Sequence, residues 1–317
     1  MSHIISSKDV ARTSHINIKV MKPLLLIFLI ASTVASAQQL TQFSLHSHNR
    51  FAVNPATAGS ESYIPVLFSY KQYWTGFNDA PRFQNLSAHG IISRRVGVGV
   101  KLFSYYTGPL DKSGAEIAYA YHIPVSASGA KLSFGLSGSI YQYAIDKNKV
   151  SFENPKEPLL VRLSDKMIIP DFNFGTCFYT EKAYIGISFL QLLNRKIDMM
   201  VSTLDQKQIT HLLVHGGYNF IINDKFSVEP NVLVKYMPQS FFQVDIGAKF
   251  KYDYVWIGAS FRTDDAISAS FGFSKDNIIV GYAYDYMISG LTNYANGTHE
   301  IILGYKINPQ KPKVAQL

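Results

Sequence analysis

The alternation of bulky apolar residues with small or polar ones constrains this chain most, and it is clearest between residues 114 and 143. One face of the first run carries Ala115, Ile117, Tyr119, Tyr121 and Ile123, and the other carries Glu116, Ala118, Ala120 and His122. After a turn over Pro124–Gly129, Leu132, Phe134, Leu136 and Ile140 alternate with Lys131, Ser133, Gly135, Ser137 and Ser139. A period of two residues predicts β-strands with two unlike faces.

The composition indicates which solvent each face meets. Only 16% of the residues are charged, whereas soluble domains have about 25%. The second face is mostly Ser, Gly and Ala, which suits a crowded or wet interior better than a soluble surface. The 20 Tyr and 21 Phe supply the aromatic girdles of membrane barrels. We therefore predict an all-β fold, a transmembrane antiparallel up-and-down β-barrel with its apolar face in lipid.

The amino-terminal residues have the pattern of a secretory signal. Met21-Lys22 precedes an apolar run over Pro23–Ile30, and Ala35-Ser36-Ala37 supplies small residues for cleavage. Residues 1–37 are expected to comprise an amino-terminal extension and a signal peptide: translation starts at Met21, residues 1–20 are a spurious or unstructured extension, and cleavage after Ala37 leaves Gln38 as the first residue of the mature protein. No later run reaches the roughly 18 apolar residues of a membrane helix, so the exported chain is expected in an outer membrane.

The mature chain divides into three expected parts. Residues 38–60 form a polar segment that lies in the periplasm or plugs the barrel, 61–308 form the barrel, and 309–317 form a tail. The alternation predicts about fourteen strands, an even number that brings both ends of the barrel wall to one side. With that side periplasmic, the long connections 144–170, 190–209 and 287–297 all fall outside. A barrel of this size is open, or is plugged by residues 38–60 or a long loop.

A series of short motifs runs in a fixed order along almost the whole mature chain. They are Val53–Ser60, Tyr70–Phe77 with Ala80-Pro81, Val96–Val100, Leu132–Leu136, Pro170–Gly175, Leu233–Tyr236, Trp256–Arg262, Val280–Tyr286 and His299–Ile301. Together they resemble the PorP/SprF family of type IX secretion system membrane proteins.

The resemblance implies an outer-membrane protein of Bacteroidota-type Gram-negative bacteria. Its partners would be type IX components and a cognate secreted surface protein, often an adhesin with a C-terminal sorting domain. The protein would assist secretion of that partner and anchor it at the cell surface, in some members in connection with gliding motility.

Six residues are candidate contacts with a partner or with a plug, because turn residues and an interfacial Trp mark unusual geometry. They are Asn54, Pro55, Gly59, Trp74, Gly76 and Phe77. An equally good interpretation is a structural turn and an aromatic girdle residue.

Seven charged residues share the small-polar parity of their strands and are expected to face the lumen. They are Glu116, Lys131, Glu229, Lys235, Asp245, Lys249 and Arg262. On the lipid face each would cost roughly 2–4 kcal/mol at mid-membrane. Cross-strand ion pairs are the favoured interpretation, and a selective permeation path is the alternative.

The sequence gives little sign of chemistry. Ser128-Gly129-Ala130-Lys131 matches a nucleophile pattern, but that pattern needs a helix and here bridges a turn into a strand. The basic residues are scattered, which argues against nucleic-acid binding. We expect no catalytic site, metal or cofactor. The alternative function is a passive porin-like channel for small solutes.

Overall fold

The computed structural model describes residues 43–146, 149, 166–197, 207–238, 241–290 and 296–308, all within the unit Gln38–Leu317. The expected signal peptide, residues 38–42 and the tail 309–317 lie outside the described residues. Within the described part of the chain, no helix is long and apolar enough to cross a membrane.

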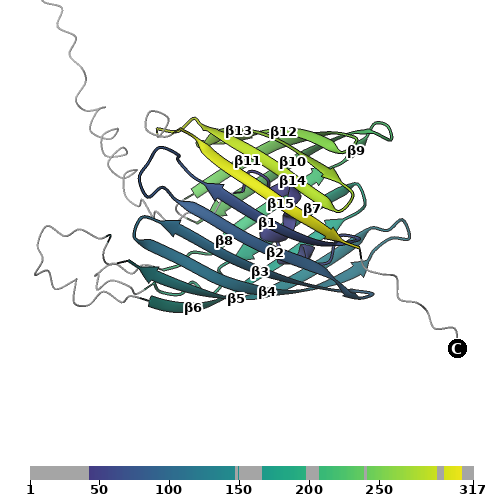
Figure 1. The fold of residues 1–317 in the computed structure, drawn as a ribbon. Helices are drawn as coiled ribbons and strands as arrows, with labels where there is room; N and C mark the ends of the chain where they lie inside the picture. The colour runs from purple at the N-terminus through teal and green to yellow at the C-terminus, as the bar shows by residue number, and fades with distance from the viewer. Residues whose placement is uncertain are drawn as a thin grey trace, which may run out of the picture. The chain divides into compact units, whose positions relative to one another are not determined.

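The wall is a single closed antiparallel barrel (Figure 1). Its strands are β1 (Ile64–Gln72), β2 (Arg82–Ser93), β3 (Val96–Thr107), β4 (Leu110–Pro124), β5 (Lys131–Ile145), β6 (Lys166–Tyr179), β7 (Ala183–Leu190), β8 (His211–Tyr218), β9 (Phe220–Ile221), β10 (Phe226–Met237), β11 (Phe241–Tyr252), β12 (Val255–Arg262), β13 (Ala266–Lys275), β14 (Ile278–Met287) and β15 (Thr298–Ile307). Because β8 and β9 both pair with β10, they form one strand interrupted at Asn219. The predicted fourteen-stranded barrel is confirmed.

Pairing between the first and last strands closes the barrel. β1 pairs with β2 on one side and with β15 on the other, and the ladder to β15 runs from Ile64 opposite Ile307 to Gln72 opposite His299. Each other strand pairs with its neighbours in sequence order. Closure leaves no exposed sheet edge, which is the condition for a β-structure inside lipid.

The two ends of the barrel differ in their connections. At the turn end, the strands are joined through residues 94–95, 125–130, 180–182, 222–225, 253–254 and 276–277, and β1 begins and β15 ends there. At the loop end, the connections are 73–81, 108–109, 146–165, 191–210, 238–240, 263–265 and 288–297. The long connections thus all lie at one end, although three short ones share it.

The outer face is apolar and open. Ile117 is 69% exposed, and Leu136, Ile257 and Phe271 are each more than half exposed. Their inward neighbours are small or polar, such as Ser137, which is 1% exposed. In water so large an apolar surface would drive association, whereas lipid is its matching solvent.

Some strands extend further than the apolar alternation predicts. β3 continues to Thr107 and β4 begins at Leu110, so only two residues join them. The apolar alternation, however, is clear only between Val96 and Leu102 and from Ala115 onward. On the outward face of these extensions, Ser104 pairs with Ser113. The strands therefore continue beyond the apolar band, where no apolar pattern is required.

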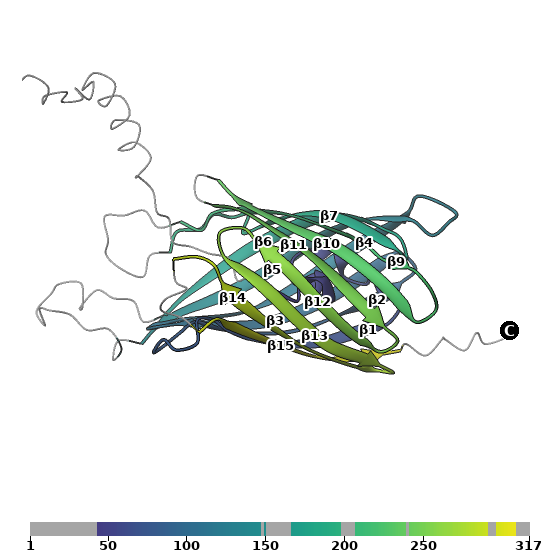
Figure 2. The same cartoon turned by 90° about the horizontal axis from the view of Figure 1, so that it is seen from above.

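Residues 43–62 lie inside the barrel and are called the plug here (Figures 1 and 2). The plug contains three short 3-10 turns, η1 (His46–His48), η2 (Arg50–Ala52) and η3 (Pro55–Thr57). Its backbone turns on itself locally: the Asn49 side chain accepts from the Ala52 N–H, and the Asn54 side chain accepts from the Ala56 N–H. Local caps of this kind satisfy backbone groups that no ladder reaches.

Candidate functional site in the barrel lumen

Inward-facing glycines form a groove that receives the plug. They are Gly97 and Gly99 on β3, Gly135 on β5, Gly175 on β6 and Gly186 on β7. A Cβ at any of them would approach another atom to less than 3.0 Å. At Gly97 and Gly135 the atoms met are plug backbone, at Ala58 and Ala56. Only glycine lets the two backbones approach so closely.

Asn54 fastens the middle of the plug to this groove. Its Nδ2 donates to the Thr176 carbonyl at 3.0 Å and lies 3.0 Å from His215 Nε2, while its Oδ1 accepts from the Ala56 N–H at 2.9 Å. The residue is fully buried, as is Pro55 beside it. Ser188 adds a hydrogen bond to the Val53 carbonyl at 2.6 Å. Asn54 Nδ2 also lies 3.4 Å from the Ile187 carbonyl on β7, so this one plug residue contacts β6, β7 and β8.

Two wall histidines hold the plug near the turn end. His122 Nε2 donates to the Ala58 carbonyl at 2.9 Å, and its Nδ1 accepts from the Tyr179 hydroxyl at 2.8 Å. His89 Nδ1 accepts from the Gly59 N–H at 3.1 Å. Gly59 has φ +77°, a conformation that suits glycine. Both rings therefore bind the plug backbone directly.

A buried cluster of charges holds the other end of the plug. Lys71 Nζ lies 3.0 Å from Asp285 and 3.3 Å from Glu300, and Arg262 lies 3.4 Å from Asp285. The Ser44 hydroxyl donates to Asp285 at 2.7 Å and accepts from Lys71 at 2.8 Å and from Arg262 at 3.0 Å. The Ser44 N–H donates to Glu300 at 2.7 Å. We call these four charged residues the loop-end cluster.

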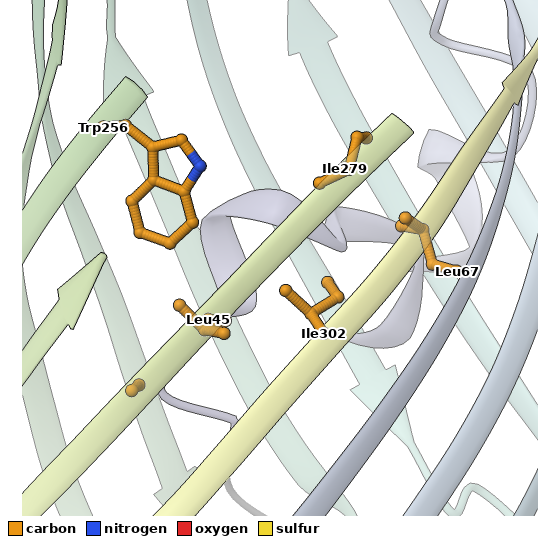
Figure 3. Packing of buried hydrophobic residues seen from close by; sticks show 6 residues of the cluster. Leu45, Leu67, Trp256, Ile279 and Ile302 are labelled. Atoms are coloured by element: carbon orange, nitrogen blue, oxygen red, sulfur yellow. The ribbon is translucent and has the colours of Figure 1, made fainter. Parts of the chain in front are cut away.

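Apolar packing accompanies these polar contacts. Figure 3 shows Leu45 of the plug among wall residues Leu67, Trp256, Ile279 and Ile302, all of them buried. On the opposite side of the plug, Phe51 is buried against Ala118 and Ala120 of β4. The plug therefore contacts both sides of the lumen.

The seven charges expected in the lumen are placed as follows. Glu116 pairs with Lys101 at 3.0 Å, Glu229 with Lys249 at 2.7 Å, and Asp245 with Arg262 at 3.0 Å. Each pair occupies facing positions on neighbouring strands. Lys235 is buried on β10, and Lys131 lies 5.9 Å from the Tyr179 ring centre at the turn end. In these ion pairs each charge is neutralised by its partner, whereas a permeation path would leave such charges exposed to solvent.

The six residues expected to contact a partner or a plug separate into two groups. Asn54, Pro55 and Gly59 belong to the plug, whereas Trp74, Gly76 and Phe77 lie in the loop 73–81 at the loop end. Phe77 is 42% exposed there.

The loop 73–81 is fixed on both sides. The Thr75 N–H donates to the Gly297 carbonyl at 2.9 Å, and the Asn296 N–H donates to the Thr75 carbonyl at 2.7 Å. On the other side, the Tyr106 hydroxyl donates to Asp79 at 2.8 Å. Trp74 adopts a positive φ of 45°, which only tertiary contacts would maintain in so large a residue.

A small cavity lies beside the plug. This polar cavity of about 20 Å³ lies between plug residues 44–48 and strands β10–β13, room for about one water molecule. Among the described residues, no three His, Cys, Asp or Glu side chains gather as metal ligands would. Cys177 is buried in the wall.

These features define an outer-membrane β-barrel whose lumen contains a plug formed by residues 43–62 of the same chain. Solved barrels share the fold. The Ralstonia pickettii toluene transporter TbuX has a TM-score of 0.50 at 12% identity, over 81% of this chain and 92% of that one. A TodX deletion mutant, a monoaromatic hydrocarbon channel, has a TM-score of 0.50 at 9% identity, over 82% and 94%. At such identities the likeness concerns the fold alone.

Residues 35–305 match the family described as type IX secretion system membrane protein PorP/SprF. The match covers most of the chain, and the protein therefore belongs to the PorP/SprF family. No curated protein matches the sequence. Neither the family nor the barrels of similar fold are enzymes by description.

Proposed function

We propose that this protein assists the type IX secretion of a cognate exported protein and anchors it at the cell surface. The partner would be adhesin-like with a C-terminal sorting domain, and its work would include gliding in some settings. The chain would be exported by its signal peptide in a Bacteroidota-type bacterium, with cleavage after Ala37 and the turn end in the periplasm.

The family match over residues 35–305 carries this proposal. The filled lumen supports it, because a barrel closed by the glycine groove, Asn54 and the loop-end cluster suits a docking role better than free diffusion. The rigid loop 73–81, with Phe77 exposed at its tip, offers a preorganised contact on the side where an exported protein would stay.

Gene deletion tests the proposal directly. We expect the surface protein encoded beside this gene to be lost from the cell surface, and to be restored by the wild-type gene on a plasmid. Surface protein can be quantified by immunoblotting of washed cells, culture medium and periplasm. Unchanged export and retention in the deletion strain would refute the role.

A passive channel for small solutes is the alternative that the barrel size raises, because fourteen strands enclose more space than wall side chains alone fill. Liposome swelling separates the two functions. We expect vesicles containing the intact protein to swell no faster in small sugars than empty vesicles. Rapid swelling would favour the channel.

A further inference from the structure

We infer that the outward face of β2–β5 beside the loop end binds the phosphorylated sugar headgroup of an outer-leaflet glycolipid. This surface is called the headgroup patch here, and its residues are Arg82, Gln84, Ser104, Tyr106, Ser113 and Gln142. The inference rests on the orientation proposed above, because a periplasmic turn end puts the loop end in the leaflet that carries glycolipid.

Strand register places the headgroup patch directly above the lipid-facing band. Figure 1 shows β2, β3, β4 and β5 side by side in the wall. The last apolar outward row consists of Leu86, Leu102, Ala115 and Ile140, which face one another across these strands. The next outward row toward the loop end consists of Gln84, Ser104, Ser113 and Gln142, again on facing positions.

The spacing of these rows puts the headgroup patch at headgroup depth. One outward step covers two residues, about 6.6 Å along a strand and less in depth because the strands tilt. The headgroup layer on each side of the hydrocarbon core is about 5–8 Å thick. The first polar row therefore lies within this layer, and the second row, with Arg82 facing Tyr106, lies at its upper edge.

The two faces of the wall exchange polarity at this height. At mid-membrane the inward positions of β5 are small or polar, such as Ser137. Behind the headgroup patch they are Tyr141 and Tyr143, which are buried together with Ile169 of β6 and packed against Phe103 of β3. An apolar inner face and a polar outer face are typical of a sheet whose exterior meets a polar medium. The core behind the patch also holds its side chains on a rigid support.

The headgroup patch occupies only one sector of the barrel. On β11–β14 the outward face stays aromatic or aliphatic almost to the loop end. The residues one position from that end of each strand are Phe242, Phe261, Ile267 and Tyr286, all of them exposed. A simple membrane boundary would give every strand the same polar margin. A polar sector limited to β2–β5 instead indicates a specific contact beside the lipid.

The chemistry of the headgroup patch suits phosphate and sugar. The Arg82 guanidinium lies over the Tyr106 ring, 4.5 Å from its centre. The nearby Asp79 carboxylate attracts Arg82 but is paired with Lys149 at 3.1 Å and accepts from the Tyr106 hydroxyl at 2.8 Å. Arg82 therefore has no ion-pair partner in the described part of the chain, and a guanidinium in this state can bind phosphate through two parallel hydrogen bonds.

The polar row beneath Arg82 supplies groups for sugar hydroxyls. Among the described residues, the side-chain amides of Gln84 and Gln142 have no hydrogen-bond partner. An amide both donates and accepts, and so do the hydroxyls of Ser104 and Ser113 between them. Asp111, which faces Tyr106, adds an acceptor at the upper edge. One cation above a row of neutral polar groups matches a phosphorylated sugar better than it matches a phospholipid headgroup.

Native mass spectrometry of the detergent-purified protein tests this inference by counting bound lipid. The probes are lipid A that carries two inner-core sugars, the same lipid after removal of its phosphates, and phosphatidylglycerol. We expect the wild-type protein to bind the first lipid most tightly. Arg82→Gln should weaken that binding about fivefold, and Gln84→Ala with Gln142→Ala should weaken it to a similar degree.

Arg94→Gln is the matched control, because Arg94 is an exposed cation like Arg82 but lies in the turn 94–95 at the opposite end. Both side chains are exposed, so both variants should fold, and Arg94→Gln should bind the glycolipid as the wild type does. Equal losses in the two variants would overturn the inference, and so would phosphatidylglycerol binding as tight as that of the glycolipid. The assay contains no exported partner, so the role in secretion can fail while glycolipid binding stands.

Discussion

Single inward glycines decide how closely the plug approaches the wall. Gly135 and Gly138 lie on the same strand, β5, but face opposite ways. A Cβ at Gly135 would meet the backbone of Pro55 and Ala56, whereas one at Gly138 would lie 3.6 Å from the Phe172 ring, an ordinary contact. The two positions therefore form a matched pair for testing the groove.

We expect Gly135→Ala to lower the free energy of unfolding by about 1–3 kcal/mol, the usual cost of overpacking, and to loosen the plug. Gly138→Ala should change neither the free energy of unfolding nor the attachment of the plug. Urea unfolding in lipid vesicles measures stability, and trypsin cleavage after Arg50, which is paired with Glu61, measures plug release. Equal behaviour of the two variants would show that the groove does not hold the plug.

Asn54 supplies a second test at the same scale. Asn54→Ala removes the donor to the Thr176 carbonyl and the acceptor of the Ala56 N–H, leaving buried groups unsatisfied. Each such group costs about 1–3 kcal/mol. We expect faster trypsin cleavage after Arg50 than in wild type, with the barrel still folded. A plug as resistant as wild type would contradict this account of its anchoring.

The sequence alternation predicted which face of its strand a charged residue occupies, but it could not predict the residue with which that charge forms an ion pair. Period-two alternation placed Glu116 and Arg262 on the inward faces of their strands. Choosing Lys101 for Glu116 required the turn at residues 108–109, which no apolar pattern marks. Pairing Lys71 with Glu300 required closure between the first and last strands, 229 positions apart. The recurrence of glycine at inward-facing positions of several strands was the one sequence signal that could have revealed the groove.

At the scale of elements, the loop-end cluster joins four strands, β1, β12, β14 and β15, to the plug. Removing Lys71 leaves Glu300, on the facing position of β15, without its cation. Breaking a buried ion pair from one side typically costs about 3–5 kcal/mol, since the remaining charge is uncompensated. The cluster should therefore respond sharply to changes that unbalance it.

We expect Lys71→Met to destabilise the barrel by about 3–5 kcal/mol in urea unfolding, and Lys71→Met with Glu300→Gln to recover part of the loss. Lys149→Met serves as the control, because Lys149 and Asp79 form an exposed pair and its loss should leave stability unchanged. A double variant as unstable as the single one would argue that the cluster is not coupled.

At the scale of elements, the ends of the strands were the features that the sequence predicted least well. The alternation marks only residues that contact lipid, so the polar outward pair Ser104 and Ser113 hid the continuation of β3 and β4. The polar segment 38–60 could be assigned to the periplasm or to the lumen, because its fit depends on glycines of several strands at once. Neither feature has a local sequence signal.

At the scale of the whole molecule, the contact of a residue with lipid depends on its depth in the membrane as well as on the face of the strand that it occupies. Ile117 lies mid-strand in β4, and Ile92 lies beside the turn at residues 94–95; they are 69% and 67% exposed. We expect Ile117→Arg to cost roughly 2–4 kcal/mol and Ile92→Arg about 0–1 kcal/mol. Urea titrations read by heat-modifiable gel migration measure both. Equal costs would mean that Ile117 does not face the membrane core.

Single-channel recording in planar bilayers tests the central claim, that the barrel is closed by its own plug. The intact protein is expected to give no steady open-channel current, because the wall packs directly on the plug, where Phe51, Asn54, Ala56 and Ala58 are each 0% exposed. Deletion of residues 43–60, with β1 left intact, is expected to produce discrete openings. A steady current from the intact protein, unchanged by that deletion, would contradict the claim.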